Sequence, residues 1–327
     1  QTADTSLFQN AAIKSLARIP SSLSYSILKK IFLQDPPVFE NDGDYSYLFD
    51  YLEDSLELAR PLFPELLALT TLQDYKDPVI QLLVALVDSG LAKRNMYKKH
   101  FPSIYIDAKT ALKKQLNKDE RRMQDEKKDE EENNEVETRY DYSAGFNTRL
   151  MNYAVLLLPY FEKDKNVQQF FNKLLNSRSV EISMETALLL LKNHKPVPDS
   201  TWLTIASKDK FRADLYDRLL YLGKPDHFPP IYLNQQIMAR SYLVAKSTAN
   251  QLDSVVFLKK QPCVFKATTG VAYFYKYRVN KSGDWKIGLS GIQPLDSAQI
   301  DISNALTILT GKSLLEHEPL DKQLNKQ

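Results

Sequence analysis

At 327 residues, the chain exceeds the size of about 250–300 residues at which a single hydrophobic core stops growing, so two or three compact regions are expected. Its 43% hydrophobic and 26% charged content excludes a wholly disordered protein, and a total of only 9 glycines argues against all-β folds and Gly-rich nucleotide loops. The 43 basic and 41 acidic side chains nearly cancel, which argues against nucleic acid or an anionic membrane as a partner.

The sequence carries no pattern for a disulfide, a metal site or a membrane span. Cys263 is the only cysteine, so an internal disulfide is excluded, and no Cys/His spacing is typical of zinc. We therefore expect no cofactor. No run of about 18 apolar residues predicts a transmembrane helix. Because Gln1 follows neither an initiator Met nor a signal segment, we expect a mature chain or an excised fragment.

Residues 1–45 predict an N-terminal helical segment. Two short helices are expected at Ala11–Leu16 and Leu23–Leu33, because each run is bounded by proline, and Asn41–Asp44 has the composition of a turn. Leucines then recur at three- and four-residue spacing from Leu48 to Leu66, which predicts a helical face that a pair of prolines interrupts near its end.

The next helix has signals at both ends. Asp77 is predicted to accept the free amides of the first turn, with Pro78 at the first helical position, where a missing N–H is tolerated. Gly90 is predicted to end this helix in a left-handed conformation. A further helix is expected at Ile104–Leu116.

Residues 117–140 form a charged insertion with hardly any apolar side chain. Charges of both signs support a solvated helical extension, which we expect to fade into a disordered acidic loop at Asp129–Glu137. A surface insertion between structural units explains this segment better than a binding arm does.

Helical periodicity resumes after the insertion. The predicted helices are Leu150–Leu158, Val167–Leu175, Met184–Leu191, a short helix capped by Asp199 or Ser200, and Phe211–Leu222 with Gly223 at its end.

The segments after Asp77 and after Val180 share a plan of an apolar helix, a short helix with one aromatic residue, and a longer amphipathic helix. At a constant offset the paired positions are Leu83 with Leu188, Leu86 with Leu191, Tyr97 with Trp202, Ile106 with Phe211, and Ala108 with Ala213. Helices with one wide apolar stripe must stack on neighbours, so residues 46–234 predict a mainly α fold, a HEAT-like α-solenoid of stacked helix pairs.

Residues 235–327 predict a small α+β region with an antiparallel meander. The period changes from that of a helix to that of a strand, and a hairpin turn is expected at residues 280–283. The predicted elements are a helix at Leu233–Ala245, short strands at Val255–Lys260 and Pro262–Thr268, a strand at Gly270–Val279 and a return strand at Trp285–Leu289.

The aromatic strand is the candidate ligand or partner surface. Tyr273, Tyr275 and Tyr277 alternate onto one face, and Trp285 follows on the return strand. Such rings stack on bases or sugars when they are exposed, but the glycine-aromatic consensus of an RNA-binding strand is missing. Packing of this face against a helix is the favoured interpretation.

Other residues with catalytic potential have no partners at a useful spacing. The segment Gly288–Gly291 resembles a nucleophile elbow, yet its spacing differs from G-x-S-x-G and no helix follows. Cys263 is expected to be a packed apolar side chain. Surface or helix-end positions are expected for the histidines, which are His100, His194, His227 and His317.

Several segments carry a resemblance to a known family, and they are Asp77–Ser89, Leu188–Ser200, Gly270–Tyr277, Asp284–Lys286 and Gln293–Pro294. Over about residues 45–327 the chain resembles the C-terminal region of large Bacteroidota proteins of the TraB/GumN family. The resemblance implies a periplasmic or cell-envelope setting and an accessory role. In that family the metal-dependent hydrolytic chemistry is attributed to an N-terminal domain with conserved histidines and glutamates, and no such motif occurs in this sequence.

These observations favour a non-catalytic helical-repeat module that binds a protein partner or another domain of its parent chain. Two alternatives remain at the level of the sequence. The chain is part of a hydrolase whose active site is assembled from distant carboxylates, or it binds cell-wall glycans through the tyrosines and Trp285.

Overall fold

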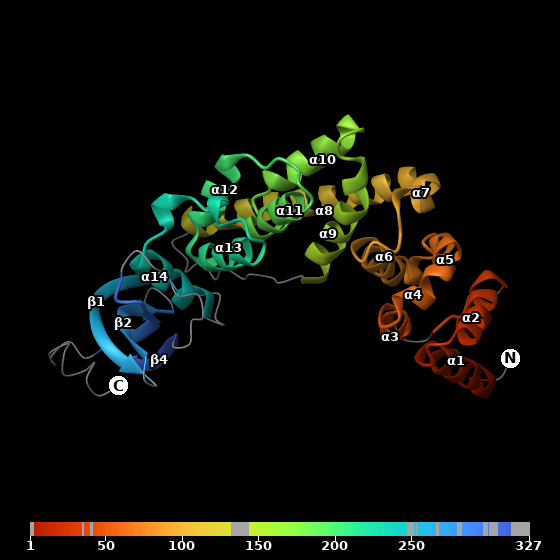
Figure 1. Ribbon diagram of the computed structural model, residues 1–327, viewed down its shortest axis with the longest axis horizontal. Helices are drawn as coiled ribbons and strands as arrows, with labels where there is room; N and C mark the ends of the chain where they lie inside the picture. The colour runs from red at the N-terminus through yellow and green to blue at the C-terminus, as the bar shows by residue number, and fades with distance from the viewer. Residues whose placement is uncertain are drawn as a thin grey trace. The chain divides into compact units, whose positions relative to one another are not determined.

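The computed structural model is mainly helical and contains a small antiparallel sheet near its C-terminal end, as the sequence predicts (Figure 1). Its contacts divide the chain into two compact units, which are Gln1–Asn117 with Ser143–Leu174 and Lys118–Tyr142 with Leu175–Gln327. The residues that the structure describes are 3–34, 36–39, 42–131, 144–246, 252, 254–265, 268–279, 283–296, 300 and 307–314.

Helices build the first unit. They are α1 (Ala3–Arg18), α2 (Ser22–Gln34), α3 (Asp42–Glu53), α4 (Leu56–Ala59), η1 (Arg60–Leu62), α5 (Phe63–Leu69), α6 (Gln73–Asp88), α7 (Arg94–Tyr97), η2 (Lys98–His100), the start of α8 (Phe101–Glu131), α9 (Ala144–Leu157), η3 (Leu158–Tyr160) and most of α10 (Lys165–Leu175). The helix α1 packs on α2 and α3, while α3 packs on α6 and α6 on α9. The core lies along this series of contacts.

The turn predicted at Asn41–Asp44 is wrong for its described part, because Asp42 opens α3. Acidic residues in a first helical turn are favoured by the helix dipole. The buried ring of Tyr45 also fixes this turn, since its hydroxyl accepts the backbone N–H of Phe39 at 3.0 Å. The leucine face that follows is divided among α3, α4, η1 and α5, with Pro61 near the start of η1 and Pro64 near the start of α5.

The predicted start of the next helix at Asp77 is also wrong. The helix α6 begins at Gln73 and contains Pro78 inside it. Tyr75 explains the early start, because its buried ring meets the ring of Phe49 edge-on with centroids 6.1 Å apart. Asp77 instead forms an ion pair with Arg149 of α9. Packing of an aromatic anchor therefore outweighs the lost amide of the proline.

The helix predicted at Ile104–Leu116 is longer than expected, because α8 runs from Phe101 to Glu131. Its charged part is the predicted helical extension. The acidic loop expected at Asp129–Glu137 begins inside this helix, and its remainder lies outside the described residues.

The second unit contains helices and the sheet. Its elements are the end of α8, α11 (Val180–Lys192), α12 (Asp199–Ala206), α13 (Asp209–Tyr221), η4 (Pro225–His227), η5 (Pro230–Tyr232), α14 (Gln235–Lys246), β1 (Ser254–Phe265), β2 (Thr268–Arg278), β3 (Lys286–Gln293) and β4 (Ile308–Ser313). The helices pack in chain order from α11 to α14. The predicted side-chain cap by Asp199 or Ser200 is wrong, because α12 begins at Asp199 after Pro198 without a side-chain cap.

The four strands form one antiparallel sheet in the order β1-β2-β3-β4. The two short strands predicted at Val255–Lys260 and Pro262–Thr268 are one strand, β1, with an irregularity between Phe257 and Lys259. Proline is tolerated in β1 because this strand lies at the edge of the sheet. The helix α14 covers one face of the sheet (Figure 1).

Three helices end in a residue with positive φ. Gly90 after α6 and Gly223 after α13 have φ of 75° and 67°, as predicted for left-handed caps. His194 takes the same role after α11 with φ of 56°, although it is not glycine. Its neighbour Lys195 donates its N–H to the carbonyl of Leu190 at 2.9 Å and so completes the helix end.

Candidate interaction surface

The predicted aromatic face is buried. The side chains of Tyr273, Tyr275 and Tyr277 pack against Ala239 and Leu243 of α14 in one hydrophobic cluster. Burial raises the pKa of Tyr275 far above its ordinary value. Stacking on bases or sugars requires an exposed ring face, so these tyrosines form no such platform in the described structure.

The hydroxyls of two of these tyrosines hold the sheet to the start of α14. Tyr275 donates to the carbonyl of Gln236 at 2.6 Å, and Tyr273 donates to Oε1 of Gln235 at 2.8 Å. The same Gln235 donates through Nε2 to the carbonyls of Pro294 and Asp296, each at 2.9 Å. The aromatic strand is thus a structural element with satisfied polar groups.

Trp285 is half-buried and is contacted by cations of its own chain. The ring centroid lies 4.5 Å from Nζ of Lys276 and 5.0 Å from Cζ of Arg278. These cation–π contacts explain why two basic residues follow each other on one face of β2.

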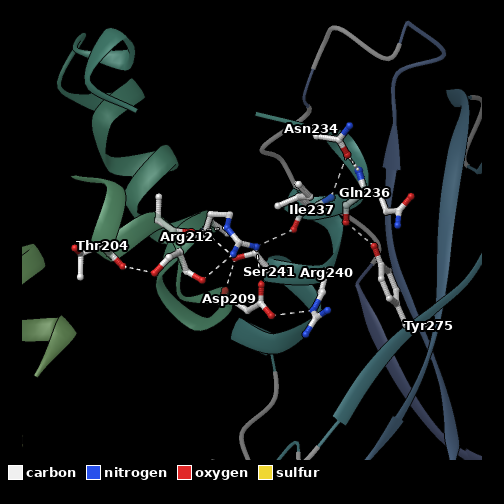
Figure 2. A network of polar contacts seen from close by, with 12 residues as sticks. Thr204, Asp209, Arg212, Asn234, Gln236, Ile237, Arg240, Ser241 and Tyr275 are labelled. Atoms are coloured by element: carbon white, nitrogen blue, oxygen red, sulfur yellow. Dashed lines mark hydrogen bonds and ion pairs between the residues drawn. The ribbon is translucent and has the colours of Figure 1, made fainter. Parts of the chain in front are cut away.

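A buried arginine joins α12, α13 and α14 (Figure 2). Arg212 is 4% exposed, and its guanidinium donates to the carbonyls of Ala206 at 2.6 Å and Ser207 at 3.1 Å. It also forms an ion pair of 2.6 Å with Asp209 and donates to the carbonyl of Ile237 at 3.4 Å. Its donors are directed at the protein, so it has a structural role.

Asp209 and Ser241 extend this network. The second carboxylate oxygen of Asp209 accepts Nε of Arg240 at 2.8 Å. The Ser241 hydroxyl donates to the Asp209 carbonyl and accepts the N–H of Ala213 at 2.9 Å. Asn234 caps α14, because its Oδ1 accepts the N–H of Gln236 at 2.9 Å (Figure 2).

Asp217 of α13 is the carboxylate with the most altered titration among those described. Its Oδ1 accepts the hydroxyl of Tyr242 on α14 at 2.9 Å. Burial raises the pKa of Asp217 to about 6, against a smaller lowering by that hydrogen bond. Burial also raises the pKa of Asp214, one turn earlier. Asp217 thus joins α13 to α14, and the neighbouring Arg218 joins α13 to α11 through its ion pair with Glu185.

The first unit has a different kind of surface on α1 and α2. Phe8 of α1, Ile19 immediately after α1, and Leu23 and Ile27 of α2 are exposed, Phe8 by 78% and Leu23 by 71%. Phe8 lies on the side of α1 opposite the buried Ile13 and Ala17, and the exposed Ala12 and Ser15 follow it toward Ile19. The Ser15 hydroxyl turns back to the carbonyl of Ala11 at 2.8 Å, which leaves the stripe largely apolar. We name Phe8, Ala12, Ile19, Leu23 and Ile27 the α1–α2 outer surface.

A cluster of one arginine and two tyrosines borders this surface. Arg18 ends α1 and donates through Nε to the hydroxyl of Tyr51 at 2.8 Å and through Nη2 to that of Tyr47. The two rings are one helical turn apart on α3 and meet edge-on at 4.8 Å. Arginine and tyrosine are enriched where protein interfaces gain most of their energy.

The histidines that the structure describes differ in setting. His194 is exposed at a helix end, whereas the ring of His227 lies 5.7 Å from that of the buried Trp202. His100 lies in η2, and His317 falls outside the described residues.

The serine of the rejected nucleophile motif, Ser290, is fully buried in β3, and its Oγ has no hydrogen-bond partner among the residues that the structure describes. Over the described ranges, no three His, Cys, Asp or Glu side chains lie close enough to hold a metal ion. Within the same residues, no helix has both the length and the apolar character needed to cross a bilayer.

Sequence reasoning missed both the Arg212 network and the α1–α2 outer surface. The spacing of Tyr47 and Tyr51 was a usable signal for the second, because residues four apart share a helix face.

Comparison with protein-family models, with curated proteins and with solved structures found no match.

Proposed function

We propose that this chain is a non-catalytic helical-repeat module that binds a protein partner, or another domain of its parent chain, through the α1–α2 outer surface. The observation that carries this proposal is the exposure of Phe8 on α1, Leu23 on α2 and Ile19 in the connection between them, beside the Arg18 cluster. Fully burying one such side chain contributes about 1.5–3 kcal/mol, so a partner that covers several of them gains a large driving force.

The shape of the surface favours a helical or grooved partner. Phe8 and Ala12 are four residues apart on α1, and Leu23 and Ile27 are four apart on α2, so each pair lies on one face of its helix. Such faces are the pattern by which amphipathic helices dock into grooves. Ile19 lies in the short connection between α1 and α2 and so links the exposed faces of the two helices. The exposed guanidinium of Arg18 adds a planar polar edge that suits the rim of an interface.

The finer architecture in this proposal is an α-solenoid. Two blocks of the same plan support it, which are α6 with α7 and α8, and α11 with α12 and α13. In both blocks a left-handed residue, Gly90 or His194, ends the first helix. A solenoid buries the apolar face of each repeat against a neighbour, so an exposed apolar face on a helix pair suits a further repeat or a partner. The resemblance to the C-terminal region of TraB/GumN-family proteins adds an accessory role in the cell envelope.

The hydrolase alternative has one specific observation in its favour. Asp217 has a pKa of about 6 and a hydroxyl partner, Tyr242, at 2.9 Å, which suits a general acid or base. Loss of a measured hydrolytic activity in Asp217→Asn, with unchanged folding, would favour this alternative over the interaction module.

Photo-crosslinking tests the proposed surface. A benzophenone amino acid replaces Phe8 in one variant and Tyr221, a 92% exposed control of the second unit, in another. Each is irradiated in extract of the native host, and the adducts are identified by mass spectrometry. We expect an adduct specific to position 8 that disappears in the Leu23→Ser/Ile27→Ser background. The purified partner should then bind that double variant at least about tenfold more weakly than the unchanged chain.

The same adducts from positions 8 and 221 would contradict the proposal. So would a purified partner whose affinity is unchanged by the double substitution. Circular dichroism of each variant checks that the helices remain folded, which is expected because the substituted side chains are exposed.

A further inference from the structure

We infer that the outer edge of β1 binds an acidic peptide segment of another protein in extended conformation, as an added strand of the sheet. This inference goes beyond the proposed function and concerns a surface of the second unit. It depends on the edge position of β1, on the charge of the sheet, and on exposed valines along the strand.

The strand β1 has an edge without a partner strand in the described part of the chain. Ser254–Phe265 pairs with β2 on one side only, and the sheet order places β1 first. It has 12 residues, about twice the usual strand length. An edge strand presents a row of backbone donors and acceptors, which is the template that extended peptides use in strand addition.

The charge of the sheet is one-sided. The strands contain Lys259, Lys260, Lys276, Arg278, Lys286 and Lys312, and they contain no aspartate or glutamate. The whole chain, by contrast, has a net charge of only +2. Opposite charges on neighbouring strands stabilise their pairing and like charges destabilise it, so an incoming strand with acidic side chains is favoured.

Exposed apolar side chains provide contact points along this edge. Val256 is 42% exposed and Val264 is 70% exposed, while Lys260 is exposed between them. The register shift between Phe257 and Lys259 places Val256 and Lys260 on opposite faces of β1, so an extended peptide that alternates apolar and acidic side chains can set an apolar residue beside Val256 and an acidic one beside Lys260. Pro262 lacks an N–H, so Ser254–Gln261 is the segment whose backbone suits pairing best.

Edge lysines and prolines commonly protect a sheet from unwanted pairing. At β1 the lysines discriminate between possible partner strands by charge. An antiparallel second copy centred on the whole strand Ser254–Phe265 would bring Lys259 of each chain opposite Lys260 of the other, which is repulsive. An acidic peptide meets no such repulsion. Nucleic acid is a weaker fit for this unit, because the tyrosines of β2 are buried and offer no stacking surface.

The test uses the full chain and a labelled eight-residue peptide that alternates Val and Glu, with binding followed by fluorescence anisotropy. A Val/Lys peptide of equal length and an acidic peptide N-methylated at alternate residues are the controls. We expect the acidic peptide to bind at least about tenfold more tightly than either control, because only it has both the charge and the free amides. Raising the salt from about 50 to 300 mM should weaken this binding several-fold.

Two charge reversals locate the site. Lys260→Glu should weaken binding of the acidic peptide by about five- to tenfold, whereas Lys246→Glu, an exposed residue of α14, should leave it unchanged. The Leu23→Ser/Ile27→Ser variant should bind the peptide normally, which separates this inference from the proposed function. Thermal unfolding of every variant checks its folding.

Four outcomes would overturn the inference. They are no binding of the acidic peptide, equal binding of its N-methylated form, equal weakening by Lys246→Glu and Lys260→Glu, and tighter binding of a single-stranded oligonucleotide than of the peptide. Sedimentation velocity without peptide tests whether a second copy of the chain occupies this edge. A dimer that Lys260→Glu changes would assign the edge to a second copy instead.

Discussion

The two units use arginine in opposite ways. In the first unit, Arg18 lies at the end of α1 with its exposed guanidinium on the rings of Tyr47 and Tyr51. In the second, Arg212 is buried, and three backbone carbonyls and Asp209 accept its donors. The hydrogen bonds of a buried guanidinium go to its own protein, while an exposed guanidinium has one side accessible to a partner. The direction of an arginine's donors, toward its own protein or toward solvent, therefore indicates its role better than the number of charges in the unit does.

Substitution of the two arginines should separate these roles, because Arg212→Met should have the largest effect on stability among these predictions and Arg18→Met only a small one. Arg212→Met removes four contacts and leaves carbonyls unpaired in the core, so it should lower the free energy of unfolding by about 3–5 kcal/mol. Arg18→Met should change it by less than about 1 kcal/mol, because its contacts are solvated. Urea unfolding followed by tryptophan fluorescence measures Arg212→Met, since both tryptophans, Trp202 and Trp285, belong to the second unit, and circular dichroism, to which the helices of the first unit contribute, measures Arg18→Met.

Arg240→Gln is the matched control, because Arg240 is an exposed partner of the same Asp209. It should cost under about 1 kcal/mol. If Arg212→Met unfolds at the same urea concentration as Arg240→Gln, the buried network does not support the junction of α12, α13 and α14.

The fold was predictable where an element is determined by its own side chains. Regular spacing gave the amphipathic helices and the alternation of β2. It misplaced the start of α6, because Tyr75 is anchored by rings that lie far away in sequence, such as Phe49. It also divided β1 at Pro262, since the edge position that tolerates proline is a property of the whole sheet.

The candidate surface was predictable only in part. The partners of Arg212 are mainly backbone carbonyls, which leave no trace in a pattern of side chains. The exposure of Phe8 and Leu23 depends on what does not pack on α1 and α2, and an amphipathic pattern cannot reveal that. The tyrosines of β2 were recognised as one face, and the favoured interpretation of packing against a helix agrees with their burial under α14.

The difference between buried and exposed charged groups also applies to Asp217, whose substitution should change the free energy of unfolding less than that of Arg212 does. Burial raises its pKa to about 6, above the ordinary value of 3.8, so the folded state favours the protonated carboxyl. Its contribution to stability is therefore greatest below about pH 4 and falls as the pH rises through about 6. Asp217→Asn can still accept the Tyr242 hydroxyl without a charge. It should raise the free energy of unfolding at pH 8 by roughly 1 kcal/mol, a value reduced for partial exposure.

Unfolding at pH 4, 6 and 8 measures this dependence, and Asp226→Asn in η4, an exposed residue, is the control. The control should follow the pH profile of the unchanged chain. An Asp217→Asn profile parallel to that of the unchanged chain would contradict this prediction, because it would show that folding does not change the pKa of this carboxyl.

The smallest expected effect compares the same helix end in the two units. Gly90 and His194 both have positive φ after the first helix of their block, and a Cβ at Gly90 would meet no neighbour within 4 Å. Any cost of a side chain there is thus backbone strain, about 1 kcal/mol for a left-handed residue. His194→Gly should stabilise the second unit by about 0.5–1 kcal/mol and move its tryptophan transition to higher urea, while Gly90→Ala should destabilise the first unit by a similar amount, measured by circular dichroism. Opposite signs are required, because one substitution relieves the strain that the other introduces; a His194→Gly variant that unfolds earlier would mean that its side chain contributes contacts worth more than that strain.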